Sequence, residues 1–302
     1  MIKKTYYIEN PARLSLKLDQ LDINSSVSEE AVTRNLDDAG MIILDHAQIS
    51  LTLPLLRSCA EKNVAITICD ESHLPSGIFI PMSGHTESGG RMRSQVESSK
   101  PLRKQIWQKT VAAKIYNQAM VLKAYGLSYQ PLIHAITKVR SGDTSNIEGT
   151  AAAYYWKHLF QGEPDFRRDR FGSEPNAMLN YSYAILRSLT AKSIIGAGLT
   201  PFMGIHHKNI YNSLCLADDI MEPFRPFADA RVKMYIDENP KLLCEHELSK
   251  SMRQYLLGIL NADVRLEDQL RPLQVSMQIV CAKLARCFED DTVSPLIYPV
   301  YE

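Results

Sequence analysis

Residues 204–226 read GIHHKNIYNSLCLADDIMEPFRP, a segment that places two imidazoles shortly before three carboxylates. Its spacing predicts a helix that ends at the last of these acids. On that helix Asp219 and Glu222 are three positions apart, so their side chains lie on the same side and can share a cation. His207 lies just before the helix, where the chain after Gly204 can turn the ring toward that side. The segment therefore predicts a candidate metal site.

The alternative is that these acids are solvated side chains late in a helix, where they oppose the helix dipole and cap nothing. A further carboxylate, Glu148, weighs against it, because it lies in a separate segment that also has the pattern of an inward-facing helix. Together with Ser145, however, Glu148 matches the capping box S-x-x-E, in which the Glu folds back onto the N–H of the Ser. The Ala-rich turns that follow favour close helix packing, and a carboxylate buried there needs a partner. Both interpretations of Glu148 stay open.

A convergence of Glu148, Asp219 and Glu222 would carry an electrostatic cost. Two carboxylates about 5 Å apart repel by roughly 3 kcal/mol at an effective dielectric constant near 20. Without compensation one of them would take up a proton, whereas a divalent cation would remove the repulsion and create a Lewis-acid site. Carboxylates with one imidazole suit Mg²⁺ or Mn²⁺, because zinc favours more nitrogen or sulfur ligands.

The formal net charge of the chain is zero, but its positive charge is concentrated. Residues 101–140 contain seven Lys or Arg and no Asp or Glu, and residues 165–172 place three arginines beside two phenylalanines. Such segments are typical of phosphate binding, with rings that can stack on unpaired bases. The alternatives are a solvated helix face and a salt-bridged loop. The candidate nucleic-acid contacts are Arg103, Lys104, Lys138, Arg140, Arg167, Arg168 and Arg170.

The hydrophobic pattern changes character once along the 302 residues. Residues 1–82 predict a small β domain, with strands near 14–18, 41–44, 64–69 and 77–81 and a helix between 51 and 62. Residues 83–99 begin with a polar, turn-rich run that predicts a linker. Residues 100–302 predict an all-α domain. Its expected helices span residues 106–125, 149–159, 176–195, 210–222, 227–236, 248–260 and 273–288.

The six cysteines form no CxxC pair and no zinc-ligand spacing. Cys59, Cys215 and Cys281 have apolar neighbours, which predicts buried thiols in a reducing compartment. The first residues lack the apolar run of a signal peptide, and no stretch approaches the length of a membrane span. These observations predict a cytoplasmic protein.

Several motifs together resemble the integrase (endonuclease) that acquires new spacers in CRISPR–Cas adaptive immunity, in the form found in type II systems. The resemblance extends over essentially the whole chain. It rests on ICDESHLPSG at 68–77, NIE at 146–148, NYSYAIL at 180–186, GIHH at 204–207 and LADDIMEPFRP at 216–226.

The resemblance implies an α+β fold, with a small N-terminal β-sandwich-like domain that builds a homodimer and a larger α-helical catalytic domain. It also implies a metal site that falls on Glu148, His207 and Glu222. The G-x-x-H pattern of the family favours His207 over His206, and a further family acid matches Asp219.

The reaction implied is metal-dependent transesterification, in which the 3′-hydroxyl of a short double-stranded DNA fragment attacks the end of a CRISPR repeat. A small ferredoxin-like partner protein is expected to join two integrase dimers. The rival interpretations are a stand-alone metal-dependent DNA nuclease, which would use water as the nucleophile, and a non-catalytic DNA-binding scaffold.

Overall fold

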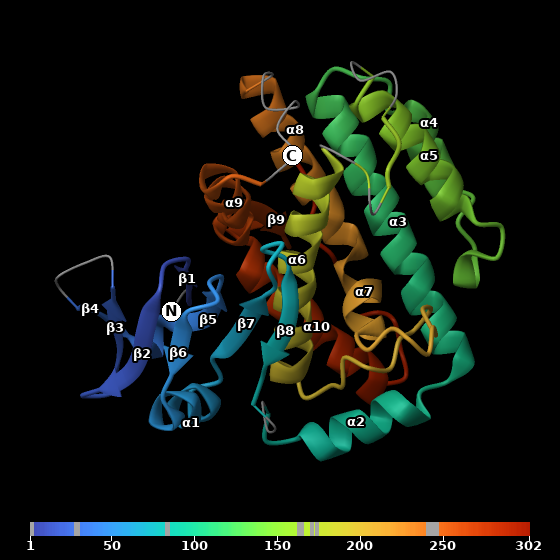
Figure 1. Cartoon of the computed structure of the whole chain (residues 1–302). Coiled ribbons are helices and arrows are strands. Elements are labelled where there is room, and N and C mark those ends of the chain that lie inside the picture. The colour runs from blue at the N-terminus through green and yellow to red at the C-terminus, as the bar shows by residue number, and fades with distance from the viewer. Residues whose placement is uncertain are drawn as a thin grey trace. The chain divides into compact units, whose positions relative to one another are not determined.

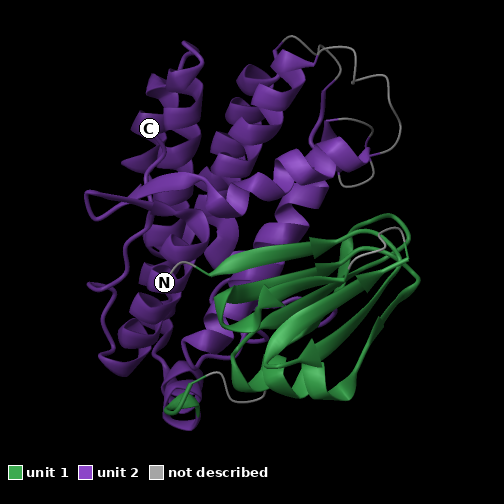
Figure 2. Cartoon of the chain, turned by 90° about the vertical axis from the view of Figure 1, so that its left-hand side faces the viewer, with its two compact units in different colours: residues 1–88 green, residues 89–302 purple. Residues whose placement is uncertain are grey.

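The computed structural model describes residues 3–26, 31–81, 85–161, 166–169, 172, 175–239 and 248–302 (Figure 1). The chain forms two compact units, residues 1–88 and residues 89–302, which Figure 2 shows in different colours. Each unit is described by itself.

The described residues of the first unit form two four-stranded sheets and one α-helix, α1 (Leu53–Glu61). One sheet has the strand order β1 (Lys4–Ile8), β5 (Ala39–Leu44), β7 (Ala65–Cys69) and β8 (Pro75–Phe79). The other has the order β4 (Val32–Asn35), β3 (Gln20–Ser25), β2 (Ala12–Lys17) and β6 (Ile49–Leu51). A short 3₁₀ helix, η1 (Leu36–Asp38), connects β4 to β5.

Both sheets and α1 contribute to one hydrophobic core, so the sandwich-like fold predicted for this part of the chain is confirmed. Leu14 and Leu21 come from one sheet, Ile42 and Ile66 from the other, and Leu55 from α1. The strand β5 lies between β1 and β7, paired parallel to each, and all six of its residues are buried. Its continuous apolar sequence therefore follows from its central place in the sheet.

The second unit is largely helical, as predicted. Its helices are α2 (Ser88–Glu97, whose first residue closes the first unit), α3 (Lys100–Ala124), α4 (Gln130–Ile136), α5 (Ile147–Leu159), α6 (Asn176–Gly196), α7 (Cys215–Met221), α8 (Arg225–Glu238), α9 (Lys250–Leu257) and α10 (Leu273–Glu289). The 3₁₀ helices within the described residues are η2 (Ser141–Asp143), η3 (Glu222–Phe224) and η5 (Gly258–Asn261). The long helix α3 packs against α4, α5, α7, α8 and η3, and α6 packs against α7, α8, α9 and α10.

The structure differs from the sequence prediction in several places within this unit. The helix α2 occupies most of the stretch expected to be a linker, residues 83–99. The helix expected over 210–222 begins only at Cys215 and passes into η3 at Glu222. The hairpin β9 (Asp263–Leu266) and β10 (Gln269–Pro272) adds a two-stranded sheet to the domain expected to be all-α. No helix in the described part of the chain is both long and apolar enough to cross a membrane.

Candidate metal centre

The start of α5 determines where the Glu148 carboxylate points. The N-cap of α5 is Asn146, whose side chain accepts a hydrogen bond from the N–H of Gly149 (3.2 Å). The Asp143 carboxylate accepts hydrogen bonds from the N–H groups of Ile147 (2.9 Å) and Glu148 (3.0 Å). These two side chains satisfy the N–H groups that a helix leaves open at its start. Of the two interpretations of Glu148 left open by the sequence, the capping box with Ser145 is therefore not the one observed, and the Glu148 carboxylate is available for contacts elsewhere.

The Glu148 carboxylate contacts a lysine of α3. Its Oε1 lies 2.5 Å from the Nζ of Lys114, and the same Nζ lies 2.5 Å from Oε2 of Glu222. The side chains of Lys114 and Glu222 are only 10% and 4% exposed, respectively. Two carboxylates from different elements, α5 and η3, therefore meet at a single buried ammonium group.

A second cation completes the charge balance at Glu222. The guanidinium of Arg225 lies 3.1 Å from its Oε1. Burial alone would raise the pKa of the Glu222 carboxyl, but Arg225 and Lys114 outweigh it, so the pKa lies below its usual value. Burial opposes the charge on Lys114 as well, and there Glu222 and Glu148 prevail and raise the pKa. Lys114 and Arg225 thus supply the positive charge that was expected from a divalent cation.

His207 is held by Asp219, whose side chain is fully buried. The carboxylate accepts hydrogen bonds from the N–H groups of Ile205 (2.6 Å), His206 (2.9 Å) and His207 (3.2 Å). Its Oδ1 also lies 2.6 Å from Nδ1 of His207. This hydrogen bond is the main reason why the pKa of His207 is raised, since burial acts in the opposite direction.

These contacts fix the role of each ring nitrogen. With Nδ1 bound to a carboxylate, the neutral imidazole carries its proton there and presents Nε2 as the acceptor. They also commit Asp219 to the loop and to the ring. The spacing of Asp219 and Glu222 predicts that they share a cation, and this stays a prediction; in the structure the Asp219 carboxylate contacts the loop and the His207 ring.

The close approach of the loop to Asp219 requires Gly204. A Cβ at this position would lie 2.2 Å from the carbonyl oxygen of His207, 2.8 Å from Cβ of Cys215 and 3.0 Å from Oδ2 of Asp219. Only a residue without a side chain allows the chain to wrap so tightly around the carboxylate.

The neighbouring imidazole, His206, is part of the packing of α3. Its ring stacks on Trp107 with ring centroids 4.1 Å apart and planes 3° from parallel, whereas His207 meets the same Trp edge-on at 5.8 Å. The ring of His207, and not that of His206, contacts the Asp219 carboxylate, and the preference for His207 as the metal ligand stays a prediction. Trp107 and Lys114 are seven residues apart, two helical turns, so both lie on the same side of α3.

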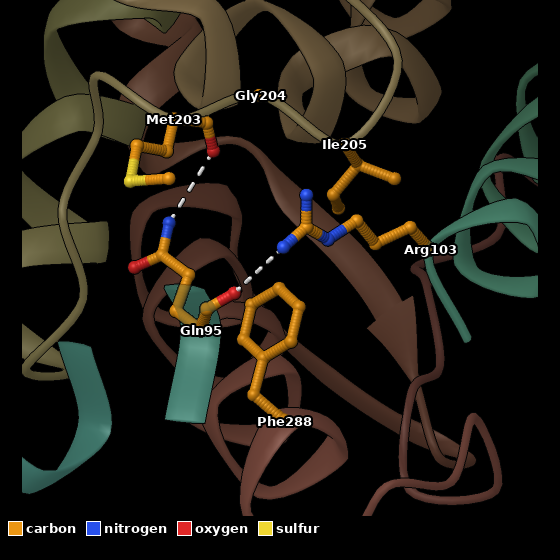
Figure 3. A pocket seen from close by; sticks show the side chains of 6 residues that line it. All are labelled: Gln95, Arg103, Met203, Gly204, Ile205 and Phe288. Atoms are coloured by element: carbon orange, nitrogen blue, oxygen red, sulfur yellow. Dashed lines mark hydrogen bonds between the residues drawn. The ribbon is translucent and has the colours of Figure 1, made fainter. Parts of the chain in front are cut away.

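A small pocket beside Gly204 is lined by residues that hold the preceding chain in place (Figure 3). The buried amide of Gln95 on α2 donates to the carbonyl groups of Thr200 (2.9 Å) and Met203 (3.3 Å) and accepts from the N–H of Thr200 (2.9 Å). Arg103 in turn donates to the carbonyl groups of Gln95 (3.4 Å) and Val96 (2.7 Å) at the end of α2. The helix α2 therefore fixes the chain immediately before Gly204.

The predicted ligands are thus positioned in two groups. Glu148 and Glu222 meet at Lys114, and His207 is held separately by Asp219, although the charge of Glu222 contributes to its raised pKa. Among the described residues no group of three or more His, Cys, Asp or Glu side chains is close enough to hold a metal ion. The donor set nevertheless fits Mg²⁺ or Mn²⁺, because it consists of two carboxylates and one imidazole nitrogen. One of its oxygens, the buried Oε2 of Glu222, contacts the ammonium group of Lys114 but receives no hydrogen bond of normal geometry.

The predicted nucleic-acid contacts divide into engaged and exposed side chains. Arg103 is engaged with α2, and Arg168 donates to Asn176 (3.0 Å) and Asn180 (2.7 Å). Lys104, Lys138, Arg140 and Arg167 are exposed, and Arg170 lies outside the described residues. The stem of Lys104 packs over Gly142 of η2, two residues after Arg140, so these two cations belong to the same surface.

Lys114 was not predicted to be part of the site, because it is one of the seven basic residues of a segment typical of phosphate binding. A signal for its burial was present. Trp107, Val111, Lys114, Gln118 and Val121 recur at helical spacing, and a lysine within such an otherwise inward-facing stripe of α3 must be paired.

Comparison with known proteins gives one consistent family. The family model described as CRISPR associated protein Cas1 matches residues 6–243. The CRISPR-associated endonuclease Cas1 of Neisseria meningitidis is 36% identical over 271 residues, which cover 89% of this chain and 86% of the relative. A Cas1 endonuclease of Pyrobaculum aerophilum is 30% identical over 209 residues, covering 65% and 71%, respectively.

Solved structures share the fold. A casposase bound to integration product superposes with a TM-score of 0.80 at 22% identity, covering 97% of this chain and 92% of that one. A Cas1 protein from Thermotoga maritima gives a TM-score of 0.77 at 16% identity, covering 99% and 100%. At sequence identities this low, the likeness to these structures supports the fold of this chain alone.

Proposed function

Because the chain belongs to the Cas1 family of CRISPR-associated endonucleases, we propose that it is a metal-dependent DNA integrase of CRISPR adaptation. It joins the 3′-hydroxyl ends of short DNA fragments to the repeat array by transesterification. The observation that carries the proposal is the meeting of Glu148 and Glu222 at one buried cationic group, in the same unit as an imidazole whose Nδ1 is fixed by Asp219.

In this proposal Glu148, Glu222 and Nε2 of His207 hold the divalent cation. When bound, Mg²⁺ or Mn²⁺ supplies Lewis-acid stabilisation of the charge on the reacting phosphate. In-line phosphoryl transfer otherwise needs positioning and charge neutralisation more than covalent help. Asp219 supplies positioning through the His207 ring, and Arg225 keeps Glu222 ionised, so that it can act as a ligand.

The exposed cations Lys104, Lys138 and Arg140 are proposed to contact the DNA backbone. Their side chains reach solvent and two of them share a surface, whereas Arg103 and Arg168 are engaged with protein groups. Contacts of this kind give affinity without sequence preference.

The proposed partners are double-stranded DNA, a second copy of the chain and a small ferredoxin-like protein. Structural neighbours support this indirectly, since they include a Cas6-RT-Cas1–Cas2 complex and a Cas1–DNA complex from other proteins. The first unit is the proposed dimer interface. Light scattering after size-exclusion chromatography should give a dimer mass for the full chain, and a monomer mass would contradict this part of the proposal.

A plasmid assay tests the reaction. Supercoiled DNA that carries a repeat is incubated with Mn²⁺ and a labelled duplex ending in 3′-hydroxyls, and the expected product is plasmid joined to label. A duplex ending in 3′-dideoxynucleotides should not be joined. Nicking with either duplex, without joining, would identify the stand-alone nuclease instead.

Site variants separate catalysis from scaffolding. Glu148→Gln, Glu222→Gln and His207→Asn should abolish joining and retain DNA binding. Glu238→Gln, on the exposed end of α8, should retain both joining and DNA binding. If the three site variants join DNA as well as the unaltered protein, the acids are structural and do not hold a catalytic metal. If the unaltered protein binds DNA without joining or nicking it, the chain is a DNA-binding scaffold. Because Asn146 and Asp143 cap α5, Glu148→Gln should cost little stability through the helix start.

A further inference from the structure

The group that joins the two carboxylates is a lysine, Lys114, and its position is the one that a shared metal ion would need. Its Nζ lies 2.5 Å from an oxygen of Glu148 and 2.5 Å from an oxygen of Glu222. A Mg²⁺ or Mn²⁺ ion bound by both carboxylates would draw on these oxygens at roughly 2.0–2.2 Å. The ammonium and the ion would then be nearly in contact and would repel each other strongly.

The charges of the cluster balance without any added ion. Glu148 and Glu222 carry two negative charges, and Lys114 and Arg225 carry two positive charges. Of the two positive charges, that of Lys114 is the one that can move away from the carboxylates. Its charge sits at the end of a flexible four-carbon stem, whereas the Arg225 guanidinium also stacks on Tyr183 (4.8 Å to the ring centroid).

We propose that Lys114 is a resident counter-cation of the metal site, which holds Glu148 and Glu222 together in the free protein and leaves at least one of them when a divalent cation binds. The inference rests on the proposed function, because it takes these two acids as metal ligands. Its consequence is that Lys114 lowers the metal affinity below that of the same ligands without a competitor. It is thus a positioning residue that prepares the ligands, and it regulates how readily the site is loaded.

The direct test is a Mn²⁺ titration of the full-length protein without DNA, followed by electron paramagnetic resonance of the free ion. Lys114→Met removes the competing charge and keeps the length of the stem, so the Kd for Mn²⁺ should fall about tenfold or more, which corresponds to a change of about 1.4 kcal/mol. Lys123→Met, on an exposed position of the same helix, should bind Mn²⁺ within about twofold of the unaltered protein.

A second readout is thermal unfolding. Without metal, Lys114→Met should melt at a lower temperature than the unaltered protein, because the two carboxylates lose their shared cation. Saturating Mn²⁺ should raise its melting temperature by more than it raises that of the unaltered protein. Lys114→Arg, which keeps the charge, should bind Mn²⁺ no more tightly than the unaltered protein.

The unaltered protein gives an independent test should Lys114→Met fail to fold. In crystals grown with Mn²⁺, with the ion located by its anomalous scattering, Nζ of Lys114 should have left at least one carboxylate. An ion bound while Nζ still contacts both carboxylates overturns the inference, and so does an unchanged or weaker Mn²⁺ affinity of Lys114→Met. If neither protein binds Mn²⁺, the proposed metal dependence fails along with the inference. Binding at Glu148 and Glu222 that is insensitive to Lys114 defeats the inference alone.

Discussion

The two halves of the candidate site are held in opposite ways. In the imidazole half (Gly204–His207 with Asp219), an anion is fixed by three backbone N–H groups and aims one ring. In the carboxylate half (Glu148, Glu222, Lys114 and Arg225), two anions are held by two side-chain cations. Peptide groups cannot leave without unfolding the loop, whereas an ammonium on a long stem can be exchanged for another cation. The site thus combines a rigidly oriented imidazole ring with a pair of carboxylates whose counter-cation can be exchanged.

The largest expected effect comes from removing the anchor of the imidazole half. Asp219→Ala leaves three backbone N–H groups without their acceptor and should lower the free energy of unfolding by about 4–5 kcal/mol, measured by urea denaturation. In Asp219→Asn the pKa of His207 should fall toward its usual value, because the hydrogen bond to a charged acceptor is lost. NMR titration of the ring measures this shift.

Asp218 provides the matched control, since it is the adjacent acid on the same helix. Its carboxylate pairs with Arg187 (2.7 Å) on the partly exposed side of α7. Asp218→Ala should cost no more than about 1 kcal/mol and leave the pKa of His207 raised. An equal loss of stability in both variants would show that the buried anchor has no special role.

A further buried acid, Asp229, is linked to the carboxylate half through Tyr183, and the pH dependence of stability should report its ionisation. Asp229 accepts hydrogen bonds from Tyr183 (2.5 Å) and Tyr155 (3.2 Å), and Tyr183 carries the Arg225 guanidinium on its ring. Burial raises the pKa of Asp229 to about 7, although the two hydroxyl groups act to lower it.

The sign of the effect follows from the proton count. Between pH 4 and pH 7 the unfolded chain has lost the proton of Asp229 and the folded protein keeps it, so stability falls as pH rises through this window and then levels off. Asp229→Asn stays neutral, so it should match the unaltered protein near pH 4 and exceed its stability by about 4 kcal/mol at pH 8. Parallel pH profiles of the two proteins would contradict the raised pKa.

The exposed cations should matter for DNA and not for folding. Replacing Lys104, Lys138 and Arg140 by Ala should weaken DNA binding roughly ten- to hundredfold at about 0.1 M salt and reduce the slope of log K against log salt by about 2–3. Fluorescence anisotropy at several salt concentrations measures both quantities. A matched triple replacement of exposed lysines on other elements should leave the slope unchanged: Lys17, Lys157 and Lys250.

The parts of the fold that could be predicted are long helices with one dominant period and strands whose residues alternate or are continuously apolar. The strands β2, β5 and β7 and the helices α3, α6 and α10 have such patterns. The strand β4 was missed because all of its residues are exposed and it has no apolar alternation. The β9–β10 turn was missed because Glu267 and Asp268 adopt positive φ values, where a Gly-containing pair is the usual signal.

The site shows the same limit. Spacing and family motifs nominated Glu148, His207 and Glu222, and these expectations remain proposals as ligands. The role of Asp219 as the acceptor that holds the loop could not be predicted, because its partners are backbone N–H groups whose direction depends on the path of the chain after Gly204. The sharing of Lys114 between α5 and η3 depends on how three elements pack, which no local pattern of the sequence contains.

The smallest expected effect comes from replacing Gly204, and comparison with Gly90 shows whether the close packing around Gly204, rather than the loss of any glycine, changes stability. Gly204→Ala forces the loop away from Asp219 and should lower the free energy of unfolding by about 1–2 kcal/mol and reduce joining, with DNA affinity retained. Gly90→Ala lies in α2, where a new Cβ meets nothing within 4 Å, and should instead stabilise the protein by about 0.5–1 kcal/mol. Denaturant unfolding of both variants gives the comparison. If Gly204→Ala also stabilises the protein, the loop tolerates a side chain, and close packing is not what makes the imidazole half rigid.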